Sequence, residues 1–126
     1  MTVPFSFADS CTHNVYLAGK MTGIPYFNKP KFDHYAQFLR NQGHKVFSPI
    51  ENDQKQTGVD FEKCPEGSHE EVKHLNLSYR VCLKQDLDWI CDYASAIALI
   101  PGWETSEGVK VELALAKCLG LKEIYL

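Results

Sequence analysis

The stretch from Ser95 to Leu119 reads SAIALIPGWETSEGVKVELALAKCL and decides the fold class that the sequence predicts. Its first part, Ala96–Ile100, is an uninterrupted apolar run, which is typical of a short strand buried on both faces. Pro101 and Gly102 end that strand, and apolar residues at helical spacing follow them. A buried strand that leads directly into a helix is the repeating unit of a parallel α/β sheet.

Glu112 is the first candidate functional residue in this stretch. Thr105 and Ser106 can each cap the predicted helix, which places Glu112 about a turn and a half inside it, close to its apolar face. A carboxylate there would be partly desolvated and would lie over the carboxyl end of the strand, where open α/β sheets bind ligands. The alternative is an ordinary surface charge paired with Lys110 or Lys117.

The composition is that of one ordinary globular domain, with 126 residues, 44% of them hydrophobic. A net charge of −3 gives no broad positive surface for nucleic acid. No apolar run is long enough to span a bilayer, and the first residues lack signal-peptide features. The five cysteines form no C-x-x-C pair, which favours a reducing compartment. We expect a cytoplasmic protein with neither a nucleic-acid nor a membrane partner.

The remaining sequence predicts alternating strands and helices. Strands are expected at 14–18, 45–48, 96–100 and 123–126, and helices at 28–41, 80–91 and 105–119. Asn28 is expected to cap the first of these helices. This order predicts an α/β fold with an open parallel sheet of four to five strands and helices on both faces. Residues 1–13 are expected to form an irregular leader.

The range 51–78 is polar and shows no clear apolar period. So long a polar connection in a small domain is typical of a binding loop or lid, or else of a mobile segment. A short helix is expected at 68–75, because Ser68 and Glu71 have the spacing of a capping box.

Several residues near the ends of the predicted strands are further candidates for a site. Residues 19–23 read GKMTG, and the two glycines allow the backbone to approach a ligand closely. Tyr16 in the preceding strand either lines the same pocket or is structural. Ser106 and Gly108 open the Glu112 helix, whose free N–H groups favour an anion, although plain capping also explains the serine.

A second carboxylate is expected from the helix at 80–91. One of Asp86, Asp88 and Asp92 pointing into the crevice would serve acid–base chemistry, while charges on a solvated face are the alternative for the others. Trp103 is a candidate for substrate contact, with packing at the rim as its alternative.

Three segments resemble the nucleoside 2-deoxyribosyltransferase superfamily. They are VYLAGxMTG at 15–23, QDLxWI at 85–90 and SxGVxxELxxA at 106–116. Together with the strands they cover most of the chain outside the leader and the polar range. The resemblance implies a Rossmann-like or flavodoxin-like fold, in which Glu112 is the catalytic nucleophile. It also implies that Asp86 contacts the base and assists its departure.

The resemblance also points to a class of substrate. Superfamily members that act on nucleosides carry an aspartate six residues before the glutamate, where Ser106 stands here. A serine at this position resembles the pattern of the branch that cleaves 2′-deoxynucleoside 5′-monophosphates, in which a carboxylate would repel the phosphate. The sequence is also similar to an uncharacterised phage and bacterial group with GxMTGIPxFN and PGWE motifs. The N-glycosidase branch has an arginine where Thr22 stands, and its relatives extend past the last strand.

These features together predict hydrolysis, or transfer, of the N-glycosidic bond of a 2′-deoxynucleoside 5′-monophosphate. The nucleophile is Glu112, with Asp86 on the side of the base. The residues expected to bind the substrate are Tyr16, Gly19, Met21, Thr22, Gly23, Trp103, Ser106 and Gly108. No metal or organic cofactor is expected, and the resemblance implies a homodimer or higher homo-oligomer. The alternatives are a non-enzymatic nucleotide-binding protein and an enzyme that processes NAD-type dinucleotides.

Overall fold

The computed structural model describes residues 12–75 and 78–126, so the predicted leader lies almost wholly outside the described residues. The strands are β1 (Asn14–Ala18), β2 (Lys45–Phe47), β3 (Ala96–Leu99) and β4 (Lys122–Tyr125). The α-helices are α2 (Lys29–Asn41), α3 (Pro49–Thr57), α4 (His69–Val72), α5 (Tyr79–Asp92) and α6 (Glu107–Cys118). Short 3₁₀ turns lie at η1 (Pro25–Asn28), η2 (Phe61–Lys63), η3 (Lys73–Leu75) and η4 (Trp103–Thr105).

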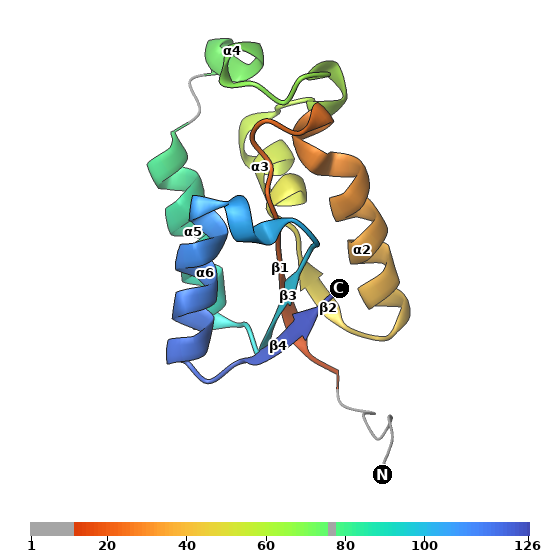
Figure 1. Cartoon of the computed structure of the whole chain (residues 1–126), viewed down its shortest axis with the longest axis vertical. Helices are drawn as coiled ribbons and strands as arrows, with labels where there is room; N and C mark the ends of the chain where they lie inside the picture. Colours follow the sequence, from red (N-terminus) through yellow and green to blue (C-terminus); the bar gives the residue numbers. More distant parts are fainter. Residues whose placement is uncertain (1–11, 76–77) are drawn as a thin grey trace.

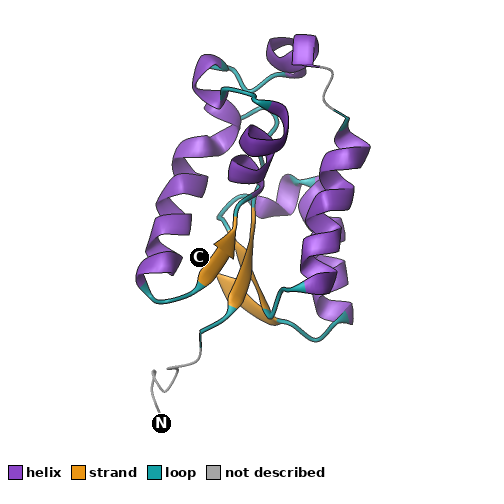
Figure 2. Cartoon of the chain, turned by 180° about the vertical axis from the view of Figure 1, so that it is seen from behind, coloured by secondary structure: helices purple, strands orange, loops and turns teal. Residues whose placement is uncertain are grey.

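The four strands form one open sheet in the order β2-β1-β3-β4, and every neighbouring pair is parallel (Figures 1 and 2). The register places Val15 beside Ala96, and Ala96 beside Lys122. The predicted parallel α/β sheet is therefore confirmed, with strand ends within one residue of those expected.

Helices cover both faces of the sheet, and each face has its own apolar core. On β1, Val15 and Leu17 belong to the core that α2 covers, while Tyr16 and Ala18 belong to the core under α5 and α6. This alternation follows from the two-residue period of a strand. Figure 1 shows α2 on one side of the sheet and α5 with α6 on the other. Tyr16 is thereby directed toward the two helices that carry Asp86 and Glu112.

The prediction of an irregular polar connection over 51–78 is wrong for its first part. Helix α3 starts directly after β2, with Ser48 at the N-cap position and Pro49 in the first turn. Farther along, Val59, Phe61, Cys64 and Val72 are buried at irregular spacing. The expected short helix is confirmed as α4, where the Glu71 carboxylate accepts a hydrogen bond of 2.9 Å from the Ser68 N–H. The part of the chain that follows α3 is therefore anchored to the core by these buried side chains.

Asn28 stands at the N-cap position of α2 but does not cap the helix with its side chain, contrary to the prediction. Its Nδ2 instead donates a 2.9 Å hydrogen bond to the carbonyl oxygen of Lys20. Tyr26, Phe27 and Asn28 all have left-handed backbone angles, which residues other than glycine rarely adopt. This turn buries the Phe27 ring against Phe61, with ring centroids 5.3 Å apart, and fixes the loop that follows β1.

No helix in the described ranges is long and apolar enough to cross a membrane.

Candidate active site

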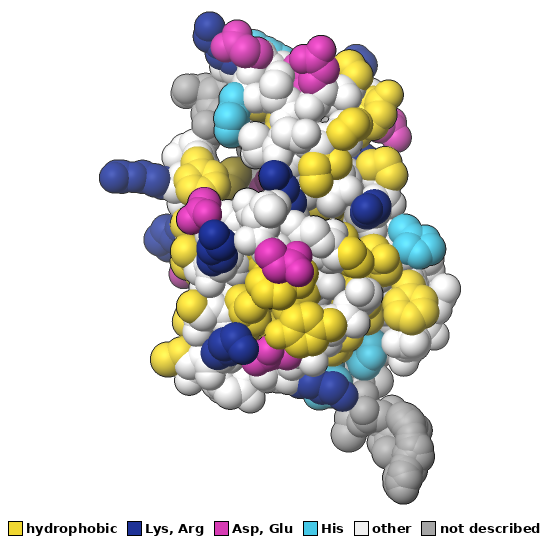
Figure 3. All heavy atoms as spheres, in the orientation of Figure 1, with side chains coloured by type: hydrophobic (Ala, Val, Ile, Leu, Met, Phe, Trp, Pro, Cys, Tyr) yellow, Lys and Arg dark blue, Asp and Glu magenta, His cyan; other side chains and the backbone are white. Residues whose placement is uncertain are grey.

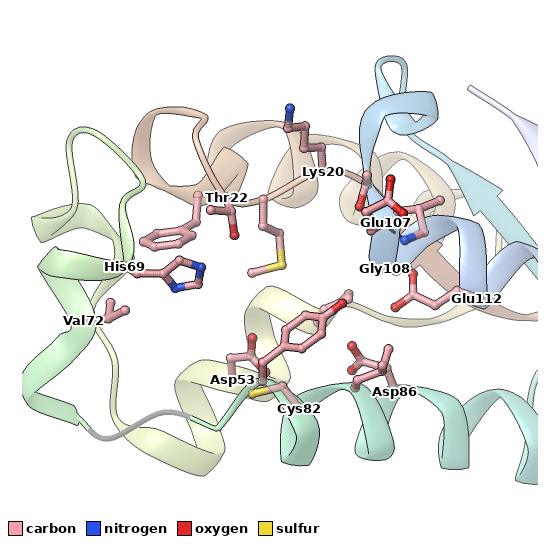
Figure 4. A pocket seen from close by; sticks show the side chains of 18 of the residues that line it. Lys20, Thr22, Asp53, His69, Val72, Cys82, Asp86, Glu107, Gly108 and Glu112 are labelled. Carbon is pink, nitrogen blue, oxygen red and sulfur yellow. Dashed lines mark hydrogen bonds between the residues drawn. The ribbon is translucent and has the colours of Figure 1, made fainter.

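A cavity of about 630 Å³ opens at the carboxyl edge of the sheet. Its walls come from the segments that follow β1, β2 and β3, from the first half of α5 and from α4, which lies at the left in Figure 4. Convergence at this edge is expected, because the loops after parallel strands emerge on the same side of the sheet. The volume lies in the range of pockets that hold small-molecule ligands.

Glu112 is buried in the wall of this cavity, with 6% of its surface exposed. One carboxylate oxygen, Oε2, accepts a hydrogen bond of 2.7 Å from the Tyr16 hydroxyl. Desolvation raises the pKa of Glu112 to about 7, with a smaller raising effect from the charge of Asp53 and an opposing effect from the Tyr16 hydrogen bond. The surface-charge alternative is excluded, since Lys110 pairs with Glu107 and Lys117 with Glu123.

Asp86 projects from the middle of α5 toward the same space, and it is the aspartate of the three candidates that is buried. Asp88 is exposed and pairs with Lys84 at 2.8 Å, and Asp92 is also exposed. Burial raises the pKa of Asp86 to about 8, and the charges of Glu112 and Asp53 add to the effect. Its Oδ1 atom is buried without a hydrogen-bond partner among the described residues.

Asp53 is a third buried carboxylate in the cavity, and the sequence analysis missed it. It lies on α3, is 8% exposed, and its Oδ1 has no hydrogen-bond partner in the described part of the chain. Burial raises its pKa to about 6, against a smaller opposing effect of the neighbouring Cys82 thiol. A usable signal was present, because Ser48-Pro49 is a typical helix start and would have placed Ile50 and Asp53 on one helix face.

Most of the predicted site residues line the cavity. Besides Glu112 and Asp86, the structure places there Tyr16, Gly19, Met21, Thr22, Ser106 and Gly108. Gly19 also permits close packing, since a Cβ atom at this position would lie 3.0 Å from the Ile100 side chain and 3.1 Å from the Phe32 ring. Two predicted residues, Gly23 and Trp103, do not line it.

Gly23 instead helps to hold one wall of the cavity. Its N–H donates a 2.8 Å hydrogen bond to the Gly67 carbonyl oxygen, and the Tyr26 N–H donates one of 2.9 Å to Cys64. A Cβ atom on Gly67 would clash with the Ile24 carbonyl oxygen, and the φ of +65° at Gly67 also favours glycine. These main-chain contacts fasten the segment of η2 and α4 to the loop after β1.

Trp103 packs outside the cavity. Its ring lies 6.1 Å from the Tyr125 ring, and it contacts the core beneath α5 and α6. The rim-packing alternative therefore describes it better than substrate contact.

The N-terminus of α6 forms another part of the cavity wall. The Ser106 Oγ accepts a 3.2 Å hydrogen bond from the Val109 N–H, which confirms Ser106 as the helix cap. Lys20 also lines the cavity and forms no ion pair with any described residue. A helix N-terminus and an unpaired ammonium group both favour a bound anion.

The described residues contain no group of three or more His, Cys, Asp or Glu side chains placed to hold a metal ion. Acidic and basic side chains are interspersed on the face seen in Figure 3, and neither sign dominates it.

A model of the family described as a domain of unknown function, DUF4406, matches residues 13–125. The chain belongs to this family. The matched range contains every residue that lines the cavity, so the site lies within the family's domain. A search of curated proteins found no match. A search of solved structures found none either.

Proposed function

We propose that this protein cleaves the N-glycosidic bond of 2′-deoxynucleoside 5′-monophosphates, with Glu112 as the nucleophile and Asp86 as the acid. The observation that carries the proposal is the pair of buried carboxyl groups on facing helices, which share one cavity and both have raised pKa values. Buried carboxyl groups with raised pKa values in one cavity are typical of sites for acid–base chemistry.

The surroundings of the two carboxyl groups fit these roles. Burial raises the pKa of both, to about 7 for Glu112 and about 8 for Asp86, and the charge of Glu112 adds to the rise at Asp86. Two neighbouring buried carboxyl groups of this kind share one proton near neutral pH, which provides one ionised nucleophile and one protonated acid. The 2.7 Å hydrogen bond from the Tyr16 hydroxyl favours the charged form of Glu112, so the proton is assigned to Asp86.

The proposed reaction has two steps. In the first, a Glu112 carboxylate oxygen bonds to C1′ of the sugar while the C1′–N bond breaks, and the base takes its electron pair and the Asp86 proton. In the second, water attacks C1′, releases Glu112 as a carboxylate and gives its proton to Asp86. The products are the free base and deoxyribose 5-phosphate. With a nucleobase as acceptor in place of water, the same intermediate leads to transfer.

The phosphate is assigned to the α6 end of the cavity. Ser106 and Gly108 open the helix there, and Lys20 supplies a cation on the neighbouring loop. Lys20 could take the place of the arginine that the N-glycosidase branch carries where Thr22 stands in this chain.

The direct test is to incubate the protein with a panel of deoxynucleoside monophosphates and the matching deoxynucleosides, and to measure free base by chromatography. We expect base release from monophosphates, with deoxynucleosides cleaved more slowly. Tight nucleotide binding without base release would contradict the enzyme and favour a nucleotide-binding protein.

Ser106→Asp should lower kcat/KM for monophosphates by about a hundredfold, because the new carboxylate faces a dianionic phosphate. Aspartate is itself a good N-cap, so the helix should be retained. The kcat/KM for unphosphorylated deoxynucleosides should not fall. Ser78→Asp is the matched control, since Ser78 caps α5 in the same way but does not line the cavity. If both variants behave alike, the phosphate does not bind at α6.

Tyr16→Phe should move the acidic limb of the pH profile of kcat/KM upward by about one pH unit. The variant removes the hydrogen bond that lowers the pKa of Glu112 and keeps the ring that stacks on Phe47. Activity should fall more below neutral pH than above it. A uniform loss across the profile would show that Tyr16 does not act through Glu112.

A further inference from the structure

The reaction proposed above leaves one buried group in the cavity without a role. Asp53 is more than nine-tenths buried, and its Oδ1 atom has no hydrogen-bond partner within the described residues. Burying an acceptor without a partner is costly, so such a group in a cavity is well suited to a ligand donor. Figure 4 shows the Asp53 and Asp86 carboxylates extending from different helices into the space that Glu112 also faces.

Apolar residues line the cavity away from the start of α6. They are Phe27, Phe61 and Val72, with Pro49 one turn before Asp53 on α3. Apolar walls with a few fixed polar groups are typical of small-molecule sites. With C1′ at Glu112 and the phosphate at the start of α6, the base is the part of the nucleotide left for this region.

On the basis of the proposed N-glycosidase reaction, we propose that Asp53 selects substrates whose base carries an exocyclic amino group, by accepting a hydrogen bond from that group. Cytosine has such a donor at C4 and adenine at C6, whereas uracil and thymine present a carbonyl oxygen at C4 and hypoxanthine presents one at C6. A carbonyl oxygen facing the Asp53 carboxylate would leave two acceptors opposed and both unpaired. Sites built around a buried hydrogen bond discriminate strongly against analogues that lack it.

Burial raises the pKa of Asp53 to about 6, so the ionised form prevails at neutral pH, and an ionised carboxylate accepts hydrogen bonds but donates none. The lining cations Lys20 and Lys73 form no ion pair with it. We therefore expect the ligand to supply the hydrogen-bond donor for Asp53 Oδ1.

The test compares pairs of nucleotides that differ only in the amino or oxo group. These are 2′-deoxycytidine with 2′-deoxyuridine 5′-monophosphate, and 2′-deoxyadenosine with 2′-deoxyinosine 5′-monophosphate. Base release by the parent protein should favour the amino member by about a hundredfold in kcat/KM. Calorimetric binding to the Glu112→Gln variant, which should not turn over, should show the same order of preference.

Asp53→Asn should reduce the amino-to-oxo ratio to about fivefold or less, because an amide can accept from an amino group or donate to a carbonyl. Asn52→Ala is the matched control. Asn52 lies on the same helix and joins α3 to α5 through a 3.0 Å hydrogen bond to Gln85, but it does not line the cavity. Its substitution should leave the ratio unchanged. Thermal unfolding should show that both variants fold.

The outcomes separate the inference from the function on which it rests. Base release with no amino preference in the parent, or with a preference that survives Asp53→Asn, overturns the role of Asp53 and leaves the glycosidase standing. No base release, together with an amino preference in binding that Asp53→Asn removes, overturns the glycosidase and supports selection by Asp53.

Discussion

Glu112→Gln is expected to reduce base release from deoxynucleoside monophosphates by at least about a thousandfold, as removal of a catalytic nucleophile typically does. The amide keeps the shape of the side chain and can still accept the Tyr16 hydrogen bond, so nucleotide binding should change only a few-fold. The neutral amide also removes a buried charge, which should leave folding intact or improve it.

Initial rates of base release and calorimetric binding on the same preparation measure the two effects separately. Glu104→Gln is a suitable control, because Glu104 is exposed on η4 and does not line the cavity. A Glu112→Gln variant that retains a rate within tenfold of the parent would rule out nucleophilic catalysis at this position.

Raising the pH from about 5 to about 8 is expected to lower the stability of the ligand-free protein by several kcal/mol, since one pKa unit corresponds to about 1.4 kcal/mol. The pKa values of Asp53, Glu112 and Asp86 all lie above their ordinary values, at about 6, 7 and 8. The folded protein therefore holds protons that the unfolded chain has already released. Stability must fall as the pH rises through this interval, and the loss is complete above the pKa of Asp86.

Thermal unfolding across this pH range measures the effect, and Asp86→Asn should remove about half of the decline, because Asp53 and Glu112 still lose their protons within the interval. The variant should unfold about 10 °C higher than the parent at the alkaline end and at nearly the same temperature at the acidic end. Asp88→Asn is the matched control, because Asp88 is exposed on the same helix and paired only with Lys84. Equal profiles for the two variants would show that Asp86 is not a buried charge in solution.

The sequence predicted the sheet and the central carboxylates because their signals are local. The apolar run at Ala96–Leu99 and the periodic residues of α6 mark the strand and helix that position Glu112. The helix that carries Asp86 has 14 residues and is recognised in the same way, but its spacing leaves Asp86, Asp88 and Asp92 open, and the choice of Asp86 follows from the family resemblance. In such elements, the spacing of apolar residues identifies the buried face directly.

The parts that sequence analysis missed depend on short elements and distant contacts. Helix α3 has nine residues and few apolar ones, so no periodic stripe marked the face that carries Asp53. The buried Val59, Phe61 and Val72 fall in turns and short helices, where no regular period exists. The sequence around Gly23 predicts a ligand-binding glycine, whereas the hydrogen-bond partner of Gly23 is Gly67, and nothing near Gly23 in the sequence indicates that pairing.

One wall of the cavity, formed by η2 and α4, is attached to the loop after β1 by hydrogen bonds. The type of these bonds affects how the cavity can change in evolution. The bonds from Gly23 to Gly67 and from Tyr26 to Cys64 join main-chain atoms only. They therefore fix the path of the main chain. The side chains of His69 and Lys73 line the cavity and take no part in these hydrogen bonds. Substitutions at those two positions can alter the inner surface without releasing the wall or disturbing the carboxylates opposite. Proteins built on this plan can thus change the ligands that their cavity accepts in small steps while the two buried carboxylates, Glu112 and Asp86, stay in place.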